Sequence, residues 1–362
     1  MTQISTETIE TALAQVIDEN LQQDIMTAGM VKDIGIEGDT VQLALEFGYP
    51  AAGYQPQLQQ QIEQCLQQAA AVQAVQCNFS TNIVSHAVQK GVKPLEHVKN
   101  IIAVASGKGG VGKSTTAVNL ALALQAEGAN VGILDADIYG PSQPRMLGCQ
   151  AKPDTDGKSL EPNVSYKLQS MSIGYLVNEE TPMIWRGPMV TSALEQMLGD
   201  TNWSDLDYLI IDLPPGTGDI QLTLCQKIPV SGAVIVTTPQ DIALLDARKG
   251  LRMFEKVEVA VLGIVENMST HVCSNCGHEE SIFGVGGGAR MAQQCDVELL
   301  GSLPLDSAIR EGVDNGRPTV AMQADSDITA AYRAIARKAA ARLSLRARDY
   351  SGKFPRIVVE NA

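Results

Sequence analysis

Continuous apolar runs, rather than alternating ones, recur along the chain from about residue 100 onward. They are rich in valine, isoleucine and leucine, which predicts strands buried on both faces, as in a parallel sheet covered by helices on each side. Helix-compatible stretches separate the runs, so we expect an α/β fold with a doubly wound, mostly parallel sheet that binds ligands at the carboxyl ends of its strands. The expected strands span 101–105, 131–135, 208–212, 233–237, 259–265 and 298–303.

The first 86 residues follow a different pattern and predict a small α/β domain. Apolar residues alternate from Val41 to Phe47, and the turn Glu37-Gly38-Asp39 precedes them, which predicts a hairpin over 31–47. Helices are expected at 7–21 and 57–72, and a further strand at 75–79.

These patterns divide the chain into four parts. We expect the small domain at 1–86, a linker at 87–99 where charge, glycine and proline mix, a large domain at 100–348 and a tail at 349–362.

The last expected helix has two interpretations. It is either packed on the sheet with its cations near its C-terminal end, or it lies on a membrane surface. Its stripe is rich in alanine and lacks tryptophan and phenylalanine, which favours packing on the sheet. The apolar stripe consists of Ile328, Tyr332, Ile335, Ala339 and Leu343.

Composition narrows the class of protein. The net charge is −14 and only 4% of residues are aromatic, which argues against a general nucleic-acid binder. The first residues do not resemble a secretory leader, and no run of about 18 apolar residues occurs, so we expect no membrane span and a cytoplasmic location. Seven cysteines, an odd number, predict thiols or metal ligands rather than a disulfide framework.

Residues 107–114 read Gly-Lys-Gly-Gly-Val-Gly-Lys-Ser and match the phosphate-loop pattern G-x-x-x-x-G-K-[ST]. An expected strand leads into the segment and an expected helix, 114–127, follows it. Glycines let successive backbone N–H groups face one anion, and the helix adds its positive N-terminal end. We expect Lys113 to neutralise the β- and γ-phosphates of ATP and the Ser114 hydroxyl to bind Mg²⁺.

Carboxylates follow two other expected strands at the same edge of the sheet. Asp135 and Asp137 come after 131–135, where a γ-phosphate and its attacking water would lie. Asp212 ends the strand 208–212 in the Walker-B arrangement that holds Mg²⁺, and a loop containing Gly216 and Asp219 follows. Helix capping or turn formation is the alternative role for such aspartates.

Cys273 and Cys276 form a C-x₂-C pair that aims two sulfurs at one ion. With His271 and His278 they would make a crowded zinc site. They would alternatively form a dithiol redox pair, although such pairs normally begin a helix. A third interpretation is a [4Fe–4S] cluster, which needs about four thiolates, so that a two-fold dimer would supply two pairs.

The phosphate loop also resembles the deviant loop of dimeric ATPases related to MinD, ParA and the nitrogenase iron protein. The resemblance rests on a second lysine, Lys108, directly after the first glycine. It implies that Lys108 reaches across a dimer to the partner's nucleotide. Asp137 would then orient the attacking water, while Asn267 recognises adenine and Pro304 flanks the base.

The wider order of motifs resembles the bacterial Mrp/ApbC iron–sulfur cluster carriers. It comprises the phosphate loop, Asp-Ala-Asp-Ile-Tyr-Gly-Pro-Ser at 135–142, Trp-Arg-Gly-Pro-Met at 185–189, Pro-Pro-Gly-Thr-Gly-Asp at 214–219 and the cysteine pair. The first domain, with its phrase at 24–31, resembles the MIP18-type domain of assembly factors. The cysteine common after the hairpin of such domains is replaced by Gly-Tyr-Pro-Ala-Ala at 48–52.

The resemblance implies a P-loop NTPase that forms a homodimer, binds a [4Fe–4S] cluster between subunits and passes it to apo-proteins, working with cluster scaffold proteins. Lys108, Lys113 and Asp137 would be catalytic. A spatial regulatory ATPase with a zinc knuckle and a nucleotide-gated reductase are the alternatives. The expected nucleotide-site residues are Gly107, Lys108, Gly109, Gly110, Val111, Gly112, Lys113, Ser114, Thr115, Asp135, Asp212, Gly216, Asp219, Asn267 and Pro304.

Overall fold

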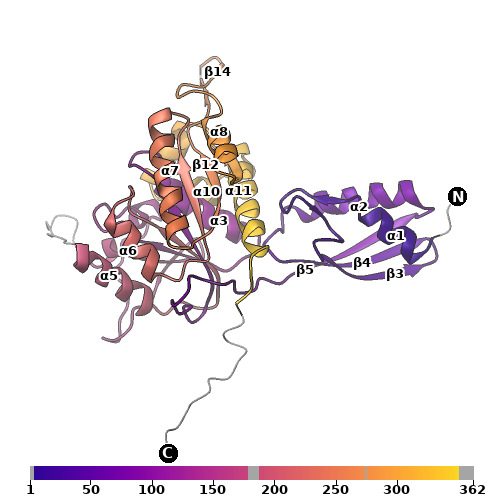
Figure 1. Ribbon diagram of the computed structural model, residues 1–362, viewed down its shortest axis with the longest axis horizontal. Coiled ribbons are helices and arrows are strands. Elements are labelled where there is room, and N and C mark those ends of the chain that lie inside the picture. The colour runs from indigo at the N-terminus through magenta and orange to yellow at the C-terminus, as the bar shows by residue number, and fades with distance from the viewer. Residues whose placement is uncertain (1–3, 178–186, 274, 350–362) are drawn as a thin grey trace, which may run out of the picture.

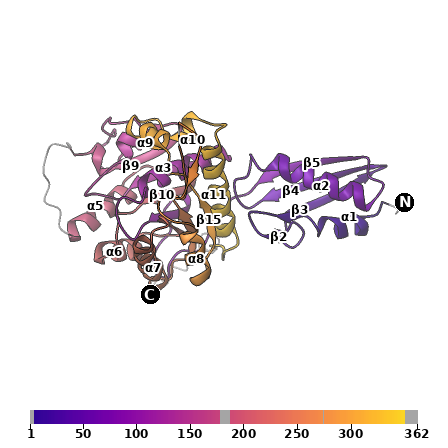
Figure 2. The same cartoon turned by 90° about the horizontal axis from the view of Figure 1, so that it is seen from above.

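The computed structural model describes residues 4–177, 187–273 and 275–349. A small N-terminal unit projects to one side of a larger α/β body (Figures 1 and 2). Its elements are α1 (Thr6–Leu13), β1 (Ile17–Asp18), β2 (Gln23–Asp24), β3 (Val31–Glu37), β4 (Thr40–Phe47), α2 (Gln55–Ala69) and β5 (Ala74–Thr81). The predicted hairpin is confirmed as antiparallel β3–β4, and β5 adds to β4 in parallel.

The predicted helix over 7–21 is wrong beyond Leu13. The reason lies in Asp18, whose buried carboxylate accepts hydrogen bonds from the backbone N–H groups of Asn20 and Leu21, both at 2.8 Å. An aspartate that bonds to its own following backbone offers the chain a turn in place of a helix. The chain therefore reverses into the short β1–β2 pair.

The larger body is built on an eight-stranded sheet in the order β15-β12-β11-β6-β10-β7-β9-β8. In the described chain every neighbouring pair in this sheet is parallel except β8–β9. The predicted strands appear as β6 (Val98–Ala105), β7 (Val131–Asp135), β10 (Leu206–Asp212), β11 (Gly232–Thr237), β12 (Val261–Glu266) and β15 (Leu299–Ser302). The pattern missed the edge strand β8 (Asn163–Ser165) and the strand β9 (Leu168–Ser172) beside it, which are short and partly polar.

Helices cover both faces of this sheet, which confirms the doubly wound expectation. Side chains of β6 alternate between two cores: Ile102 and Val104 belong to one, and Ile101 and Ala103 to the other. The first core includes α3 (Lys113–Ala126), α9 (Ser307–Asp314), α10 (Thr319–Met322) and α11 (Asp327–Ser344). The second includes α5 (Gly187–Gly199), α6 (Asp219–Lys227), α7 (Asp241–Lys256) and α8 (Gly287–Gln294).

Three shorter elements complete the described chain. They are α4 (Gln143–Met146), the 3₁₀ turn Ile173–Tyr175 and a small antiparallel pair, β13 (His271–Val272) with β14 (Glu279–Glu280). No helix in the described part is both long and apolar enough to cross a membrane.

Helix α11 packs on the sheet, and this settles its two interpretations. Tyr332, Ile335, Ala339 and Leu343 of the stripe are buried and Ile328 is partly buried, so the apolar face is covered by protein. The helix therefore offers no apolar stripe to a membrane.

The N-terminal unit is attached to the body through the far end of α3. The carboxylate of Glu127, at the C-terminal end of that helix, is fully buried. It accepts hydrogen bonds from Arg333 at 2.8 Å, from Arg337 at 2.6 Å and from the backbone N–H of Gly53 at 2.7 Å. One carboxylate thus joins α3, α11 and the N-terminal unit.

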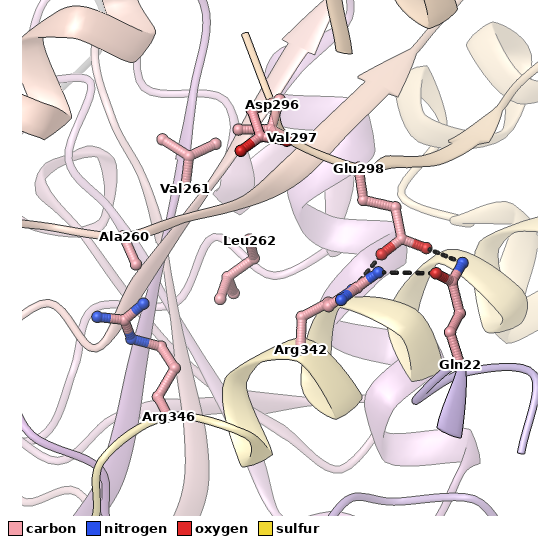
Figure 3. A pocket seen from close by; sticks show the side chains of 9 residues that line it. All are labelled: Gln22, Ala260, Val261, Leu262, Asp296, Val297, Glu298, Arg342 and Arg346. Carbon is pink, nitrogen blue, oxygen red and sulfur yellow. Dashed lines mark hydrogen bonds and ion pairs between the residues drawn. The ribbon is translucent and has the colours of Figure 1, made fainter. Parts of the chain in front are cut away.

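A second contact lies beside a pocket of about 470 Å³ between the two parts (Figure 3). Gln22 of the N-terminal unit donates to Glu298 at 3.1 Å, and Arg342 of α11 contacts both of these residues.

The expected linker 87–99 differs from the structure in two respects. Strand β6 already begins at Val98. The Gln89 side chain is buried, donating to the carbonyls of Cys225 at 2.6 Å and Ile228 at 3.2 Å. Of the expected tail 349–362, only Asp349 is described, and its backbone N–H donates to the Ser85 carbonyl at 2.9 Å.

The buried triad around Glu127 generates a stability prediction. We expect Glu127→Ala to lower the free energy of unfolding by about 3–5 kcal/mol, because it leaves two arginines without their counter-charge in a partly dry interface. The exposed pair Lys32–Glu46 is the control, and Lys32→Ala should cost less than about 1 kcal/mol. Urea unfolding of both variants measures the difference, and equal costs would contradict a structural role for the triad.

Candidate functional site

The segment 106–112 connects β6 to α3 and has the backbone of a phosphate loop. Gly110 and Gly112 both have φ of +82°, a left-handed conformation that favours glycine. Gly107 is required for a different reason. A Cβ at Gly107 would lie 2.1 Å from the carbonyl carbon of Asp246, so the loop rests directly on the backbone of α7.

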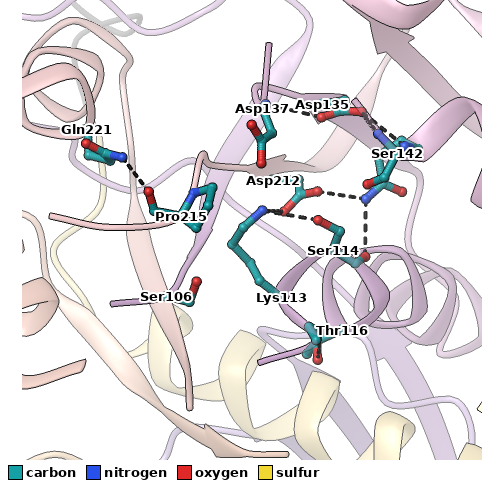
Figure 4. A network of polar contacts seen from close by, with 12 residues as sticks. Ser106, Lys113, Ser114, Thr116, Asp135, Asp137, Ser142, Asp212, Pro215 and Gln221 are labelled. Atoms are coloured by element: carbon teal, nitrogen blue, oxygen red, sulfur yellow. Dashed lines mark hydrogen bonds and ion pairs between the residues drawn. The ribbon is translucent and has the colours of Figure 1, made fainter. Parts of the chain in front are cut away.

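Lys113 and Asp212 form a buried ion pair at the centre of the site (Figure 4). Asp212 is the last residue of β10, and the parallel register places it opposite Val104 of β6 and Asp135 of β7. The Lys113 Nζ atom also lies 3.2 Å from the Ser114 hydroxyl. Three neighbouring strand ends therefore bring together the lysine, the hydroxyl and the carboxylates predicted from separate motifs.

Asp135 organises the loop that follows β7. Its Oδ2 atom accepts hydrogen bonds from the backbone N–H groups of Ser142 at 2.9 Å and Gln143 at 3.0 Å, and from the Ser172 hydroxyl at 3.1 Å. Burial, and then the nearby Asp212 carboxylate, raise the pKa of Asp135 to about 7. Its contacts make it a brace for the loop.

Asp137 lies in that same loop, with its carboxylate directed toward Asp212 (Figure 4). Burial raises its pKa, while the Lys113 ammonium acts in the opposite direction. A carboxylate in this place can accept a proton or a hydrogen bond from a water beside the phosphate loop.

Gln143 was missed by the sequence analysis. It is fully buried, and its Nε2 donates to Asp212 Oδ2 at 2.9 Å and to the Ser114 carbonyl at 3.2 Å. The sequence carried one signal, its position directly after the Asp-Ala-Asp-Ile-Tyr-Gly-Pro-Ser stretch.

A pocket of about 310 Å³ opens beside the phosphate loop. Asn267 and Pro304, both predicted near the base, line it together with Gly110, Gly112 and Thr115. Leu305, next to Pro304, also lines the pocket, as the resemblance implies for the loop beside the base. The other apolar walls were not predicted, and they come from Met146, Met268, Ile309 and Val313. The side-chain amide nitrogen of Asn267 already has a partner, because Nδ2 donates to the Val111 carbonyl at 2.9 Å.

The loop after β10 meets the phosphate loop only at its start in the described residues. The backbone N–H of Gly216, which has φ of +106°, donates to the Ser106 carbonyl at 2.9 Å. Asp219 instead lies in the first turn of α6. Gly109 is exposed on the open side of the phosphate loop.

Lys108 is partly exposed on the phosphate loop. Its carbonyl accepts a hydrogen bond from the Ser106 hydroxyl at 2.9 Å. Its ammonium forms no hydrogen bond or ion pair with any residue in the described ranges. The charge is therefore available to a group outside the chain.

Cys273 and Cys276 lie on the turn between β13 and β14. The Cys273 N–H donates to the His278 carbonyl at 2.9 Å, and the Gly277 N–H donates to the Cys273 carbonyl at 2.8 Å. Hydrogen bonds from the backbone N–H groups of Asn275 and Cys276 lower the pKa of Cys273. Cys276 is exposed. The turn thus carries one exposed and one partly exposed cysteine, and the pKa of the partly exposed Cys273 is lowered.

The structure weakens two of the three interpretations of this pair. His271 is turned toward the body, with Nδ1 3.0 Å from the Leu305 carbonyl, and no group of three or more histidine, cysteine or acidic side chains converges within the described residues. The pair lies between two short strands, whereas dithiol redox pairs normally begin a helix. Of the Trp-Arg-Gly-Pro-Met run, Trp185 and Arg186 lie outside the described residues, and Gly187 begins α5.

A family model described as "NUBPL iron-transfer P-loop NTPase" matches residues 97–340. The chain belongs to this family. A second model, described as "Iron-sulfur cluster assembly protein", matches residues 6–77, so both parts of this NUBPL-family chain resemble proteins of iron–sulfur metabolism.

Individual relatives agree with the family assignment. The "Iron-sulfur cluster carrier protein" of Escherichia coli K12 is 52% identical over 333 residues, which cover 91% of this chain and 90% of that protein. A nucleotide-binding protein of Archaeoglobus fulgidus, solved in complex with ADP, is 38% identical, with a TM-score of 0.55 over 64% of this chain and 91% of that one.

A more distant solved structure shows the fold alone. The cell division ATPase MinD of Pyrococcus furiosus is 24% identical, with a TM-score of 0.51 over 66% of this chain and 97% of that one. The resemblances stated from sequence to the MinD-like ATPases and to the cluster carriers are thereby confirmed at the level of fold and family.

The contact of the phosphate loop with α7 generates a prediction. We expect Gly107→Ala to destabilise the protein by about 1–3 kcal/mol and to abolish ADP binding, because a methyl group cannot fit against the Asp246 backbone. Gly140→Ala is the matched control, since a Cβ there meets nothing within 4 Å. Thermal melts and ADP titration of both variants measure the effect. Normal ADP affinity in Gly107→Ala would show that the loop tolerates displacement.

Proposed function

We propose that the chain is an ATP-hydrolysing carrier that binds a [4Fe–4S] cluster between two copies of itself and delivers it to apo-proteins. The observation that carries the proposal is the hairpin at 271–280, which holds one exposed and one partly exposed cysteine and is anchored next to a phosphate loop. Two thiolates are half of the set that normally holds such a cluster, so a second copy related by a two-fold axis would supply the other half.

The nucleotide site offers ligands for Mg²⁺ bound with ATP. The Ser114 hydroxyl and the Asp212 carboxylate are close together, and the buried Ser142 Oγ and Gln143 Oε1 atoms have no hydrogen-bond partner among the described residues. This donor set of oxygen atoms fits a hard cation. When held by these residues, Mg²⁺ would offset the negative charge of the phosphates.

The protein groups then have separate tasks in hydrolysis. Lys113 would exchange Asp212 for the β- and γ-phosphates, while Asp137 would orient the attacking water. The free ammonium of Lys108 would reach the nucleotide of the second copy. Asn267, Pro304 and the apolar wall of the adjacent pocket would hold the adenine.

The surface beside the phosphate loop supports contact with a second copy. Ile242 and Leu245 of α7 are 70% and 56% exposed, and Val285, before α8, is 74% exposed. Gly287 packs against the Pro239 backbone, which holds the loop of Val285 close to the start of α7. Exposed apolar side chains gathered near a site mark a protein interface more often than they mark open surface.

Nucleotide state can reach the cysteines through the end of β12. Asn267 donates to the Val111 carbonyl in the phosphate loop, and the adjacent Glu266 carboxylate accepts the Gly288 N–H at the start of α8. Residues 267 to 287, with the cysteine hairpin between them, are therefore held at both ends beside the phosphate loop. A shift of Val111 on nucleotide binding would move the base of the hairpin.

The proposed function also implies partner proteins and a cellular compartment. We propose that the N-terminal unit recruits apo-proteins and cluster scaffold proteins, because it matches an assembly-protein family and projects from the body. All seven cysteines are free thiols, which supports a reducing compartment such as the cytoplasm.

Anaerobic reconstitution with iron and sulfide tests the cargo. We expect about four iron and four sulfide per dimer in the wild type, and loss of both in Cys273→Ala and in Cys276→Ala. Cys295→Ala is the control, because Cys295 lies at the C-terminal end of α8, outside the hairpin that carries the pair. Iron and sulfide analysis with size-exclusion chromatography measures the ratio. Zinc bound by a monomer, with no cluster formed, would instead favour a regulatory ATPase with a metal knuckle.

Alkylation of the two thiols tests the relay without any cluster. In the wild type, we expect saturating ADP to change the rate of iodoacetamide modification of Cys273 or Cys276 by at least about five-fold, as followed by mass spectrometry of their peptide. Asn267→Ala, measured at its own saturating ADP concentration, should lose most of this change.

The matched control for that experiment is Asn202→Ala, which removes exposed hydrogen bonds to Ser159 and Glu161. It should retain the wild-type response. An undiminished ADP effect in Asn267→Ala would rule out the contact with Val111 as the relay.

A further inference from the structure

Gln143 occupies an unusual position in the nucleotide site. It is the first residue of α4, its side chain is fully buried, and its backbone N–H is bonded to Asp135. Its Nε2 donates to Asp212 at 2.9 Å and to the Ser114 carbonyl at 3.2 Å. One side chain thus touches both residues that the magnesium ion would need.

The orientation of the Gln143 amide is fixed by chemistry. The two groups that it contacts are acceptors only, so the NH₂ end must face them and the carbonyl oxygen must point elsewhere. That oxygen, Oε1, is buried and has no hydrogen-bond partner in the described chain, and the same is true of the neighbouring Ser142 Oγ. A buried acceptor without a donor costs about 1–3 kcal/mol.

Another buried glutamine of the same chain has a hydrogen-bond donor for its carbonyl oxygen. Gln89 is also buried, and its Nε2 also donates to two carbonyls. Its Oε1, however, accepts the Val230 N–H at 3.0 Å. The unmet acceptor of Gln143 is therefore not a general property of buried glutamines here, and it belongs to a side chain whose Nε2 is bonded to Asp212 and to the Ser114 carbonyl.

We propose that Gln143 is a positioning residue for the magnesium ion, an inference that rests on the proposed nucleotide function. Its amide nitrogen holds the Asp212 carboxylate, and its Oε1 accepts a hydrogen bond from a water molecule of the Mg²⁺ shell, with Ser142 Oγ as a second partner for that water. Mg²⁺ fits because it dehydrates reluctantly and keeps several waters, each of which is a donor.

The short helix α4 extends the consequence of this contact. Gln143 begins it and Met146 ends it, and Met146 lines the pocket beside the phosphate loop. A single turn of helix therefore connects the metal end of the site to the nucleoside end.

Titration of Mg²⁺ into the full-length protein preloaded with ADP tests the proposal by calorimetry, without any turnover. Gln143→Met replaces the amide with an apolar chain of similar length. We expect it to raise the apparent Mg²⁺ dissociation constant by at least about ten-fold, as for other residues that hold a metal through its ligands. ADP affinity in EDTA should stay close to that of the wild type.

Gln89→Met is the matched control, because it removes a buried glutamine of similar contacts whose partners, Cys225, Ile228 and Val230, lie at and just after the end of α6 and outside the phosphate loop. It should lower thermal stability and leave the Mg²⁺ constant unchanged. If Gln143→Met does not fold, Ser142→Ala removes the other unpartnered acceptor without removing any protein contact of that hydroxyl. A weaker Mg²⁺ affinity in Ser142→Ala would then support the proposal.

The possible outcomes distinguish the proposed nucleotide function from the proposed role of Gln143 in Mg²⁺ binding. A wild type that does not bind ADP overturns the nucleotide function and this inference with it. A wild type that binds ADP equally well with Mg²⁺ and with EDTA leaves the nucleotide function standing but overturns the metal role. An unchanged Mg²⁺ constant in Gln143→Met, or in Ser142→Ala where that variant is needed, makes these side chains structural braces only.

Discussion

Two buried carboxylates on adjacent strands, Asp135 and Asp212, are the constraint around which the site is built. The parallel register places them opposite each other at the ends of β7 and β10, and both are fully buried. Burial, and then the like charge of the Asp212 carboxylate, oppose ionisation of Asp135 and raise its pKa. Several hydrogen-bond donors surround the two carboxylates and offset this cost. Lys113 and Gln143 serve Asp212, while backbone N–H groups and a hydroxyl serve Asp135.

This arrangement makes the site sensitive to what occupies it. If the Lys113 ammonium moved to a phosphate, Asp212 would lose its counter-charge. A divalent cation would then take the place of the ammonium beside Asp212. Because Asp135 holds the loop of Asp137 through backbone N–H groups, any change in its charge reaches that loop directly. The same loop supplies Gln143, so Lys113, Asp212 and this loop belong to one hydrogen-bonded network, to which a bound metal ion would be coupled.

The sequence predicted those parts of the structure that local pattern determines. Continuous apolar runs predicted the buried strands. Parallel pairing then required the carboxylates that end these strands to meet at one edge of the sheet. It did not reveal Gln143, because its partner Asp212 lies 69 residues away and its position after the 135–142 motif does not by itself show where the side chain points. Nor did it reveal that Asn267 bonds to the phosphate loop, 156 residues distant, or that Asp18 ends the first helix early. These contacts depend on tertiary placement, which periodicity does not encode.

Helix α3 connects the nucleotide site to the N-terminal unit. It begins at Lys113 in the phosphate loop and ends beside Glu127, whose carboxylate and carbonyl both accept N–H groups of the N-terminal unit, from Gly53 and Ala52 respectively. Most of this 14-residue helix is buried, including the whole run 116–124, so it is packed in the core between these two ends. The cysteine hairpin is attached to the same phosphate loop through Asn267. One loop is thus connected to the cysteine hairpin on one side and, through α3, to the N-terminal unit on the other. Under the proposed function, cluster binding and partner recruitment would then share one physical control.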